Sequence, residues 1–152
     1  MKSIIFPNHI LIPEIKKLID QGHTTTFKVK GFSMRLFLEN NRDKVILAPV
    51  QGPLKKYDVI LAEIKPGIYV LHRIIRINGN EIILQGDGNI GTIEKCTPKN
   101  VIGIAKGFYR KDRSHPDMVT GLKWRIYSKI WLTLTPFRRI ILGIYRRLPI
   151  RI

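Results

Sequence analysis

Residues 59–89 read VILAEIKPGIYVLHRIIRINGNEIILQGDGN. Apolar and β-branched side chains fill three segments, 59–64, 68–77 and 81–85, and such residues favour strands. Turn residues separate the segments, first Lys65-Pro66-Gly67 and then Asn78-Gly79-Asn80. We predict three successive strands here. The Asn78-Gly79 pair predicts a type I′ hairpin turn, because both central positions of that turn need a positive φ.

Further strand-forming segments flank this stretch. Residues 24–30, 44–48 and 101–109 are rich in β-branched and apolar residues, and glycines in the last segment indicate a bend or bulge. Before them, Pro13 stands at the first turn of a short predicted helix that ends at Asp20, ahead of Gly22. The sequence therefore predicts a mainly β fold with a short N-terminal helix.

The last part of the chain has a different texture. From Met118 onward, apolar residues recur every four positions, and basic residues lie mostly off that line, which predicts an amphipathic helix. Pro136 should end or kink the helix, and residues 137–148 continue as a second helical piece. The apolar positions are Leu122, Ile126, Ile130 and Leu134. We accordingly divide the chain into a helical segment (1–23), a β domain (24–110) and a basic helical tail (111–152).

The composition limits the function classes. The chain has 152 residues, 44% of them hydrophobic, which is enough for one domain with a real core. Its net charge of +16, from 27 Lys and Arg against 11 Asp and Glu, favours an anionic partner such as nucleic acid or an acidic lipid surface. Residues 117–152 hold eight basic residues and a single acid, Asp117.

Cysteine content and hydropathy add expected absences. Cys96 is the only cysteine, so no internal disulfide can form and a zinc knuckle is not expected. We expect no cofactor. The N-terminal residues do not resemble an export signal, and the longest uncharged apolar runs fall short of the roughly 20 residues that span a bilayer as a helix. We expect a cytoplasmic protein or one peripheral to the cytoplasmic face of a membrane.

Three short segments at strand ends carry residues suited to chemistry. Ser33 follows a strand and a glycine, where backbone N–H groups could hold an oxyanion; it is also an ordinary turn residue. His72 lies in an apolar strand and could act as a base near neutral pH, or it could be a satisfied core histidine. Asp87, between two glycines, could orient an imidazole or simply form a loop. The isolated Glu94 and the absence of a ladder of acidic ligands argue against a calcium loop.

Taken together and in this order, the three boxes resemble the superfamily of signal peptidase I and the LexA-like peptidases. The boxes are Ser33-Met34 after a strand, Val70-Leu71-His72-Arg73-Ile74, and Gln85-Gly86-Asp87-Gly88-Asn89. The histidine makes the chain most similar to the archaeal and endoplasmic-reticulum signal peptidases, because the bacterial enzymes carry a lysine there. The resemblance covers residues 24–110 and implies the coiled, barrel-like β fold of that superfamily.

The resemblance also implies roles for individual residues. Ser33 would attack the scissile carbonyl, His72 would take and return the proton, and Asp87 would support or orient the site. The substrate would be an extended peptide, such as a leader or signal-like sequence, that adds beside strands near the site. Gly31, Phe32 and Met34 would contact it, with Met34 lining a pocket.

The chain departs from the family at several positions. Gly31 offers no hydroxyl as an oxyanion donor, so the site must rely on backbone N–H groups, and Leu36 replaces the usual proline. Ile93 stands where some relatives have a second aspartate, and the neighbouring Glu94 could substitute for it. An alternative interpretation is a weak or inactive peptidase scaffold that binds an anionic membrane or nucleic acid through its basic tail.

Members of that family are held by a transmembrane helix, whereas this sequence predicts none, and the predicted tail helix suggests a replacement. One interpretation places Trp124, Tyr127 and Trp131 in the headgroup region of an anionic bilayer, contacted by residues 118–152. The other packs the apolar stripe on the β domain and leaves the charged face in water. Nucleic acid is the less favoured partner, because no helix-turn-helix precedes the β unit and no aromatic stacking motif is present.

Overall fold

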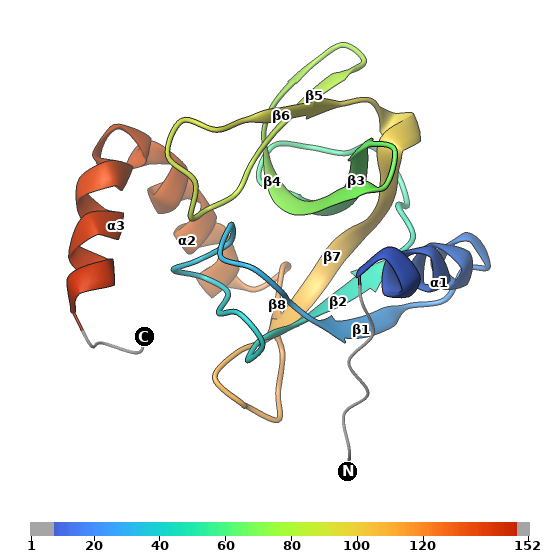
Figure 1. Cartoon of the computed structure of the whole chain (residues 1–152), viewed down its shortest axis with the longest axis horizontal. Coiled ribbons are helices and arrows are strands. Elements are labelled where there is room, and N and C mark those ends of the chain that lie inside the picture. Colours follow the sequence, from blue (N-terminus) through green and yellow to red (C-terminus); the bar gives the residue numbers. More distant parts are fainter. Residues whose placement is uncertain (1–7, 149–152) are drawn as a thin grey trace.

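The computed structural model describes residues 8–148 and consists of one antiparallel sheet with helices at two sides (Figure 1). The helices are α1 (Asn8–Asp20), α2 (Leu122–Thr133) and α3 (Arg138–Arg147), with short 3-10 turns at Pro98–Asn100 and Thr135–Phe137. The strands are β1 (Thr25–Lys28), β2 (Lys44–Ala48), β3 (Val59–Lys65), β4 (Ile68–Asn78), β5 (Glu81–Gln85), β6 (Glu94–Cys96), β7 (Val101–Tyr109) and β8 (Asp117–Met118).

The mainly β architecture that the sequence predicts is confirmed. The strands follow the order β1-β2-β7-β3-β4-β5-β6, and β8 pairs with β7. All of these pairings are antiparallel. Two-residue turns join β3 to β4 and β4 to β5, as antiparallel neighbours allow. The described sheet does not close: β1 and β6 form its two ends.

The hairpin turns follow from the turn residues, with one correction. Lys65 pairs with Ile68, so Pro66 and Gly67 are the central residues of the first turn, and Gly67 takes the positive φ (75°) that only glycine adopts easily. In the second turn Asn78 pairs with Glu81, which makes Gly79-Asn80 the central pair instead of the predicted Asn78-Gly79. Positive φ is confined to Gly79, as in a type II′ turn with glycine first.

Helix α1 is longer than its sequence signals predict. It begins at Asn8, which places Pro13 inside the helix and not in its first turn. Proline removes one backbone hydrogen bond at that position. The earlier turn is nevertheless held because Ile12, Ile15 and Ile19 are all buried in one core cluster with Leu47 and Leu61 of the sheet. Burial of an apolar side chain contributes on the order of 1.5–3 kcal/mol, which offsets the lost hydrogen bond.

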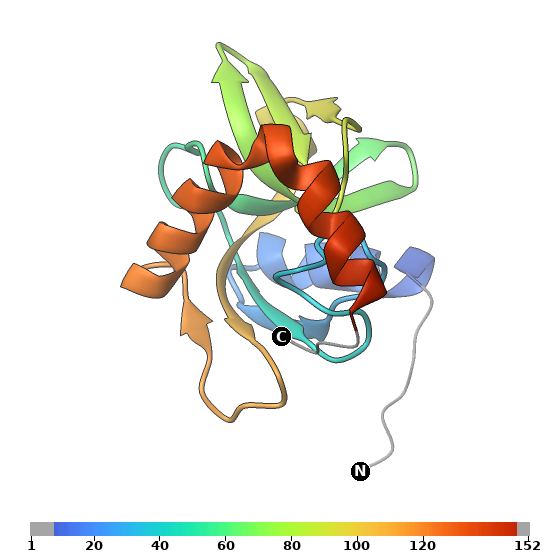
Figure 2. The ribbon, with the colours of Figure 1, turned by 90° about the vertical axis from the view of Figure 1, so that its left-hand side faces the viewer.

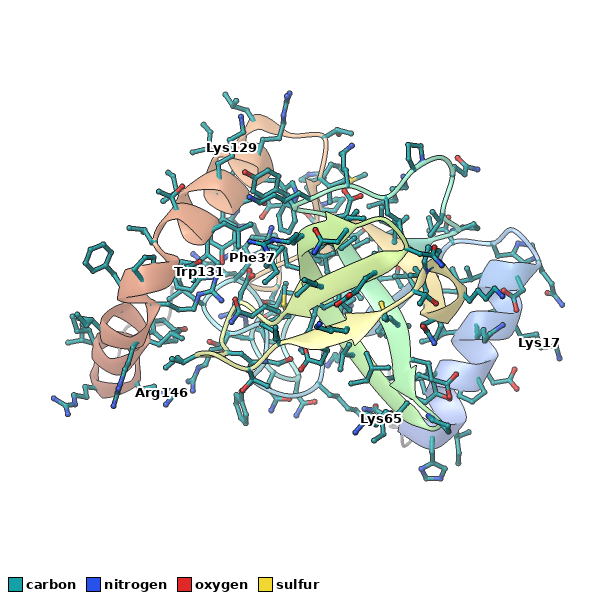
Figure 3. All side chains as sticks on the ribbon, turned by 90° about the horizontal axis from the view of Figure 1, so that it is seen from above. Lys17, Phe37, Lys65, Lys129, Trp131 and Arg146 are labelled. Atoms are coloured by element: carbon teal, nitrogen blue, oxygen red, sulfur yellow. The ribbon has the colours of Figure 1, made fainter. Side chains whose placement is uncertain are left out.

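The two C-terminal helices form as predicted, with the break at Pro136. Their packing differs from both predicted arrangements. The aromatic side of α2 faces the sheet, with Trp124, Ser128 and Trp131 buried, while the stripe that begins at Leu122 and Ile126 points to solvent. Figure 3 places Trp131 between these helices and Phe37, whereas Lys129 and Arg146 lie at the outer edge.

Edge-to-face and stacked rings explain why the aromatic side is the buried one. Trp124 packs against Phe37 and Phe108 with ring centroids 4.8 and 4.9 Å apart, and it belongs to the same core cluster as Val45 and Val59. Aromatic rings bury more apolar area than the aliphatic stripe could and add favourable pair geometry. The segment 111–152 is therefore no appendage over its described part, because it completes the core of the β domain.

Candidate active site

The centre of the site is a hydrogen bond between two side chains that lie 22 positions apart. His72 Nδ1 lies 2.8 Å from Glu94 Oε2, and the His72 side chain is almost fully buried. β4 presents His72, and β6 carries Glu94 to it across β5. An ionised carboxylate can only accept, so this contact places the proton on Nδ1 and leaves a lone pair on Nε2. Within residues 8–148, Nε2 makes no hydrogen bond.

Ser33 lies in the turn that follows β1, held against the connection between β5 and β6. Its carbonyl accepts a hydrogen bond from Gly88 N–H at 2.7 Å. A Cβ at Gly86 would lie 2.2 Å from that carbonyl oxygen, and one at Gly88 would lie 2.5 Å from Phe32 O. The two glycines thus permit a close approach of two backbones, which no larger residue allows. Residues 86–93 connect β5 to β6, so the segment that contacts the backbone of Ser33 is followed immediately by Glu94.

The serine turn keeps several donors unused. The Ser33 hydroxyl is half-buried and makes no hydrogen bond to the described part of the chain. The backbone N–H groups of Ser33 and Met34 likewise donate to no described residue. Such paired N–H groups beside a nucleophile are the donors that can bind a developing oxyanion. Gly31 stabilises the start of the turn, where its N–H donates to Asn40 Oδ1 at 2.9 Å and its φ is 90°.

Asp87 occupies a different position from the one expected for a residue that orients the imidazole. Its carboxylate forms a two-pronged pair with Arg73, with N–O distances of 2.8 and 2.7 Å, and accepts a third hydrogen bond from the Tyr127 hydroxyl at 3.1 Å. Successive residues of a strand point to opposite faces, so Arg73 and Asp87 lie on the other face of β4 from His72. The carboxylate that contacts the imidazole is that of Glu94, whereas Asp87 contacts Arg73.

The buried ion pair is strongly coupled to its surroundings. Burial acts to lower the pKa of Arg73, but the charge and hydrogen bonds of Asp87 outweigh it and raise that pKa above its ordinary value. Burial, with the adjacent Asp87 charge, raises the pKa of Tyr127 well above its usual range. The guanidinium of Arg73 also lies 4.4 Å from the Trp124 ring and donates to Ser128 Oγ at 2.6 Å. Helix α2 thus contributes a hydrogen-bond acceptor and an aromatic ring to the surroundings of Arg73.

Both C-terminal helices contact the β5–β6 connection that borders Ser33. Trp131 Nε1 donates to the Asp87 carbonyl at 3.2 Å, and Arg138 donates to the Asn89 carbonyl at 3.3 Å and to Gln85 Oε1, at the end of β5, at 2.7 Å. Arg138 is itself buried, and its guanidinium lies 5.2 Å from the Trp131 ring. Sequence reasoning did not find these supporting residues. Two signals were available: arginines inside apolar segments, and a tryptophan on the side of α2 opposite the leucine and isoleucine stripe.

The remaining predicted site residues separate into exposed and buried positions. Phe32 is exposed beside the serine, with the Arg35 guanidinium 5.3 Å from its ring, so it can meet a substrate. Met34 does not line an open pocket as expected: it is 2% exposed within the core, where its sulfur accepts from Asp87 N–H at 3.4 Å. Leu36 has a φ of 84°, a conformation that a proline cannot adopt.

Other reactive groups lie outside this arrangement. Cys96 is buried, and burial raises the pKa of its thiol, which makes it a structural residue. Within residues 8–148 no cluster of three or more His, Cys, Asp or Glu side chains is suited to hold a metal ion. None of the helices in that range combines the length and the apolar character of a membrane-spanning helix.

Comparison of the sequence with models of known protein families, and with curated proteins, finds no match to either. The chemistry must therefore be argued from the residues and their geometry.

Proposed function

We propose that this chain is a serine endopeptidase of the signal-peptidase type, with Ser33 as nucleophile, His72 as general base and Glu94 as the acid that orients the base. The proposal includes the fold of the signal peptidase and LexA-like superfamily. The observation that carries it is the 2.8 Å hydrogen bond between His72 and Glu94. A buried imidazole held by a carboxylate on one nitrogen can accept a hydroxyl proton on the other. Ser33 Oγ and His72 Nε2 make no hydrogen bond to each other in this structure, and the proposal assigns that contact to the substrate complex.

The proposed reaction is acyl transfer in two steps. His72 Nε2 accepts the Ser33 proton as Oγ attacks the scissile carbonyl, and the resulting oxyanion is bound by the N–H groups of Ser33 and Met34. The imidazolium then gives its proton to the leaving amine, which breaks the peptide bond and leaves an acyl group on Ser33. Water, activated by the same histidine, hydrolyses that ester. Glu94 keeps its hydrogen bond to Nδ1 throughout and so stabilises the imidazolium.

The substrate in this proposal is an extended peptide. Strand β6, which carries Glu94, ends the described sheet order, so one of its edges is unpaired. An extended segment can add to such an edge through main-chain hydrogen bonds, with alternate side chains reading the pockets beside it. Phe32 is the exposed apolar side chain nearest Ser33 in sequence and is available to contact a substrate side chain.

The test is covalent labelling with a fluorophosphonate probe at several pH values from 6 to 9, followed by peptide mass spectrometry. We expect one adduct, on the peptide that contains Ser33. Ser33→Ala should abolish the adduct, and His72→Ala should slow its formation by at least 10²-fold, on the order expected for loss of a general base. Ser114→Ala, which removes an exposed serine between β7 and β8, should label as the parent does.

Two results would overturn the proposal. One is labelling that persists undiminished in the Ser33→Ala variant, since the reactive group would then lie elsewhere. The other is a folded parent protein that never labels at any pH in this range, which would favour the binding-scaffold alternative. Thermal unfolding of each variant distinguishes loss of reactivity from loss of structure.

A further inference from the structure

The outer side of α2 and α3 carries apolar side chains that the fold leaves uncovered. In α2 the exposed positions recur every four residues, so they lie along one side of the helix, opposite the buried Trp124 and Trp131. The same holds in α3, where Arg138 and Leu142 face the sheet. The exposed residues, which we call the outer stripe, are Leu122, Ile126, Ile130, Phe137, Ile140, Ile144 and Leu148. Leu122 is 70% and Ile140 62% exposed.

The two halves of the outer stripe lie on the same side of the molecule. Figure 2 shows α2 and α3 together in front of the sheet, so the sides of both helices that do not pack on the body point away from it. The buried contacts of Trp131 with Asp87 and of Arg138 with Gln85 hold both helices in this orientation. The outer stripe is therefore part of a rigid surface.

Basic residues flank the outer stripe without local neutralisation. Arg125, Lys129, Arg139, Arg146 and Arg147 are exposed, and none forms an ion pair with a carboxylate among residues 8–148. Lys123 is paired with Asp117. Residues 118–152 contain no Asp or Glu at all. An apolar stripe bordered by unpaired cations matches the boundary between acyl chains and anionic headgroups.

We propose that the outer side of α2 and α3 binds the surface of an anionic lipid bilayer, with the aliphatic side chains entering the headgroup boundary. This differs from a membrane contact through Trp124, Tyr127 and Trp131, because those side chains pack against the β domain and are not available to lipid. It holds independently of catalysis by Ser33. If both proposals hold, the hydrogen bonds from Trp131 and Arg138 to the β5–β6 connection fix the position of Ser33 relative to the bilayer.

Charge and side-chain chemistry favour a bilayer over other occupants. Sites for single-stranded nucleic acid use aromatic rings that stack on bases, but here the two tryptophans face inward and the outer stripe is aliphatic except for Phe137. A second copy of the chain docked on the same side would bring two acid-free, basic surfaces together, and like charges repel. Anionic lipid satisfies both the apolar and the basic character.

The test is co-sedimentation with vesicles of phosphatidylcholine alone or of phosphatidylcholine and phosphatidylglycerol in a 3:1 ratio. We expect binding to the anionic vesicles that weakens at least tenfold when salt rises from 0.1 to 0.5 M, since salt screens the attraction. The triple variant Ile126→Gln, Ile140→Gln, Ile144→Gln should bind at least tenfold more weakly. Its matched control, Ile10→Gln, Val50→Gln, Ile68→Gln, changes three exposed apolar residues outside α2, α3 and the β5–β6 connection and should bind as the parent.

A second pair of variants separates the location of charge from its amount. Arg125→Gln, Lys129→Gln, Arg139→Gln removes three positive charges beside the outer stripe, and Lys28→Gln, Lys65→Gln, Lys99→Gln removes three from other exposed sites. We expect at least a tenfold loss in the first and less than threefold in the second. Equal losses in both would overturn the proposal, because net charge alone would then explain binding.

Three other outcomes would also overturn it. The first is equal partition into neutral and anionic vesicles, or none into either. The second is tighter retention by a labelled oligonucleotide that depends on the same arginines but not on the isoleucines. The third is a stable dimer in sedimentation velocity that the isoleucine triple variant dissociates. Unchanged unfolding temperatures of all four variants establish that these exposed substitutions leave the fold intact.

Discussion

At the scale of single residues, two carboxylates that look alike in the sequence have opposite environments. Glu94 is partly exposed and meets His72, whereas Asp87 is buried and paired with Arg73. The effect of neutralising each carboxylate depends on the residue with which it is paired. An uncompensated guanidinium in the core costs about 3–5 kcal/mol, while a partly solvated acid that orients an imidazole contributes little to stability but much to reactivity.

These environments predict different effects for two conservative substitutions. Glu94→Gln should slow the labelling of Ser33 by about 10²–10⁴-fold, because an amide no longer fixes the tautomer of His72, and should change the free energy of unfolding by less than about 1 kcal/mol. Asp87→Asn should instead lower the free energy of unfolding by about 3–5 kcal/mol. Labelling kinetics and urea unfolding of both variants check this. Parent-like labelling in Glu94→Gln, with loss in a folded Asp87→Asn, would assign the orienting role to Asp87.

The identity of the orienting acid was the part of the site that the sequence could not decide. The sequence identifies Ser33 and His72 as candidates because each lies in a segment that resembles a family motif. It offers Glu94 only as a substitute for a missing aspartate. What places Glu94 on His72 is the register of β6 against β5, in which Glu94 pairs with Leu84. A three-residue strand gives almost no periodic signal, so β6 and its register are invisible before the fold is known.

At the scale of elements, the connection between β5 and β6 links the serine turn to the acid. Gly86 and Gly88 in this connection indicate a tight turn from sequence alone. The structure gives a different reason for them: a neighbouring backbone lies where their side chains would be. Neither glycine has the positive φ that marks Gly31, Gly67 or Gly79.

Substitution of these glycines should displace the serine turn. Gly86→Ala and Gly88→Ala place a Cβ against the backbone of Ser33 or Phe32, so the turn must move, and we expect at least a tenfold slower labelling of Ser33. Overpacking of this kind also lowers the free energy of unfolding by about 1–3 kcal/mol. The control is Gly143→Ala in α3, where no atom lies within 4 Å; it should label normally and gain up to about 1 kcal/mol from helix propensity. Normal labelling in both site variants would show that the turn tolerates the shift.

The long strands were the predictable elements. β2, β5 and β7 match their predicted residues, and β3 and β4 differ by one residue at an end, because each carries a continuous apolar run bounded by turn residues. The start of α1 was missed because tertiary burial of Ile12 outweighs the proline signal. The two-residue strand β8 depends wholly on its pairing with β7 and has no signal of its own.

At the scale of the whole molecule, charge and helical period predict a basic helical tail that either contacts a membrane through its aromatic residues or packs its aliphatic stripe on the β domain. The packing differs from both: the aromatic side of α2 is buried and the aliphatic stripe is exposed. The period of four in α2 is real, but it identifies the side that faces solvent. The buried face of α2 contains Trp124 and Trp131, with Tyr127 half-buried beside them. Their spacing of three and four residues is equally compatible with the membrane-facing interpretation. An amphipathic pattern alone does not say which apolar side meets the protein, because that depends on the complementary surface, here Phe37 and Phe108.

This packing predicts that the β domain does not stand without its helices. A chain that ends at Asp117 loses Trp124 from the core and leaves Arg73 without its contacts to Ser128 and the Trp124 ring. Removal of one buried tryptophan side chain costs about 3–5 kcal/mol, against a total stability of about 5–15 kcal/mol for a domain. We expect this chain to show no cooperative thermal transition and to be degraded rapidly by trypsin. A chain that ends at Leu134 keeps α2 and should still unfold cooperatively, at a lower temperature, since it lacks the Arg138–Gln85 contact. If the chain that ends at Asp117 unfolds at the same temperature as the parent, the β domain folds without α2 and α3 and the prediction is wrong.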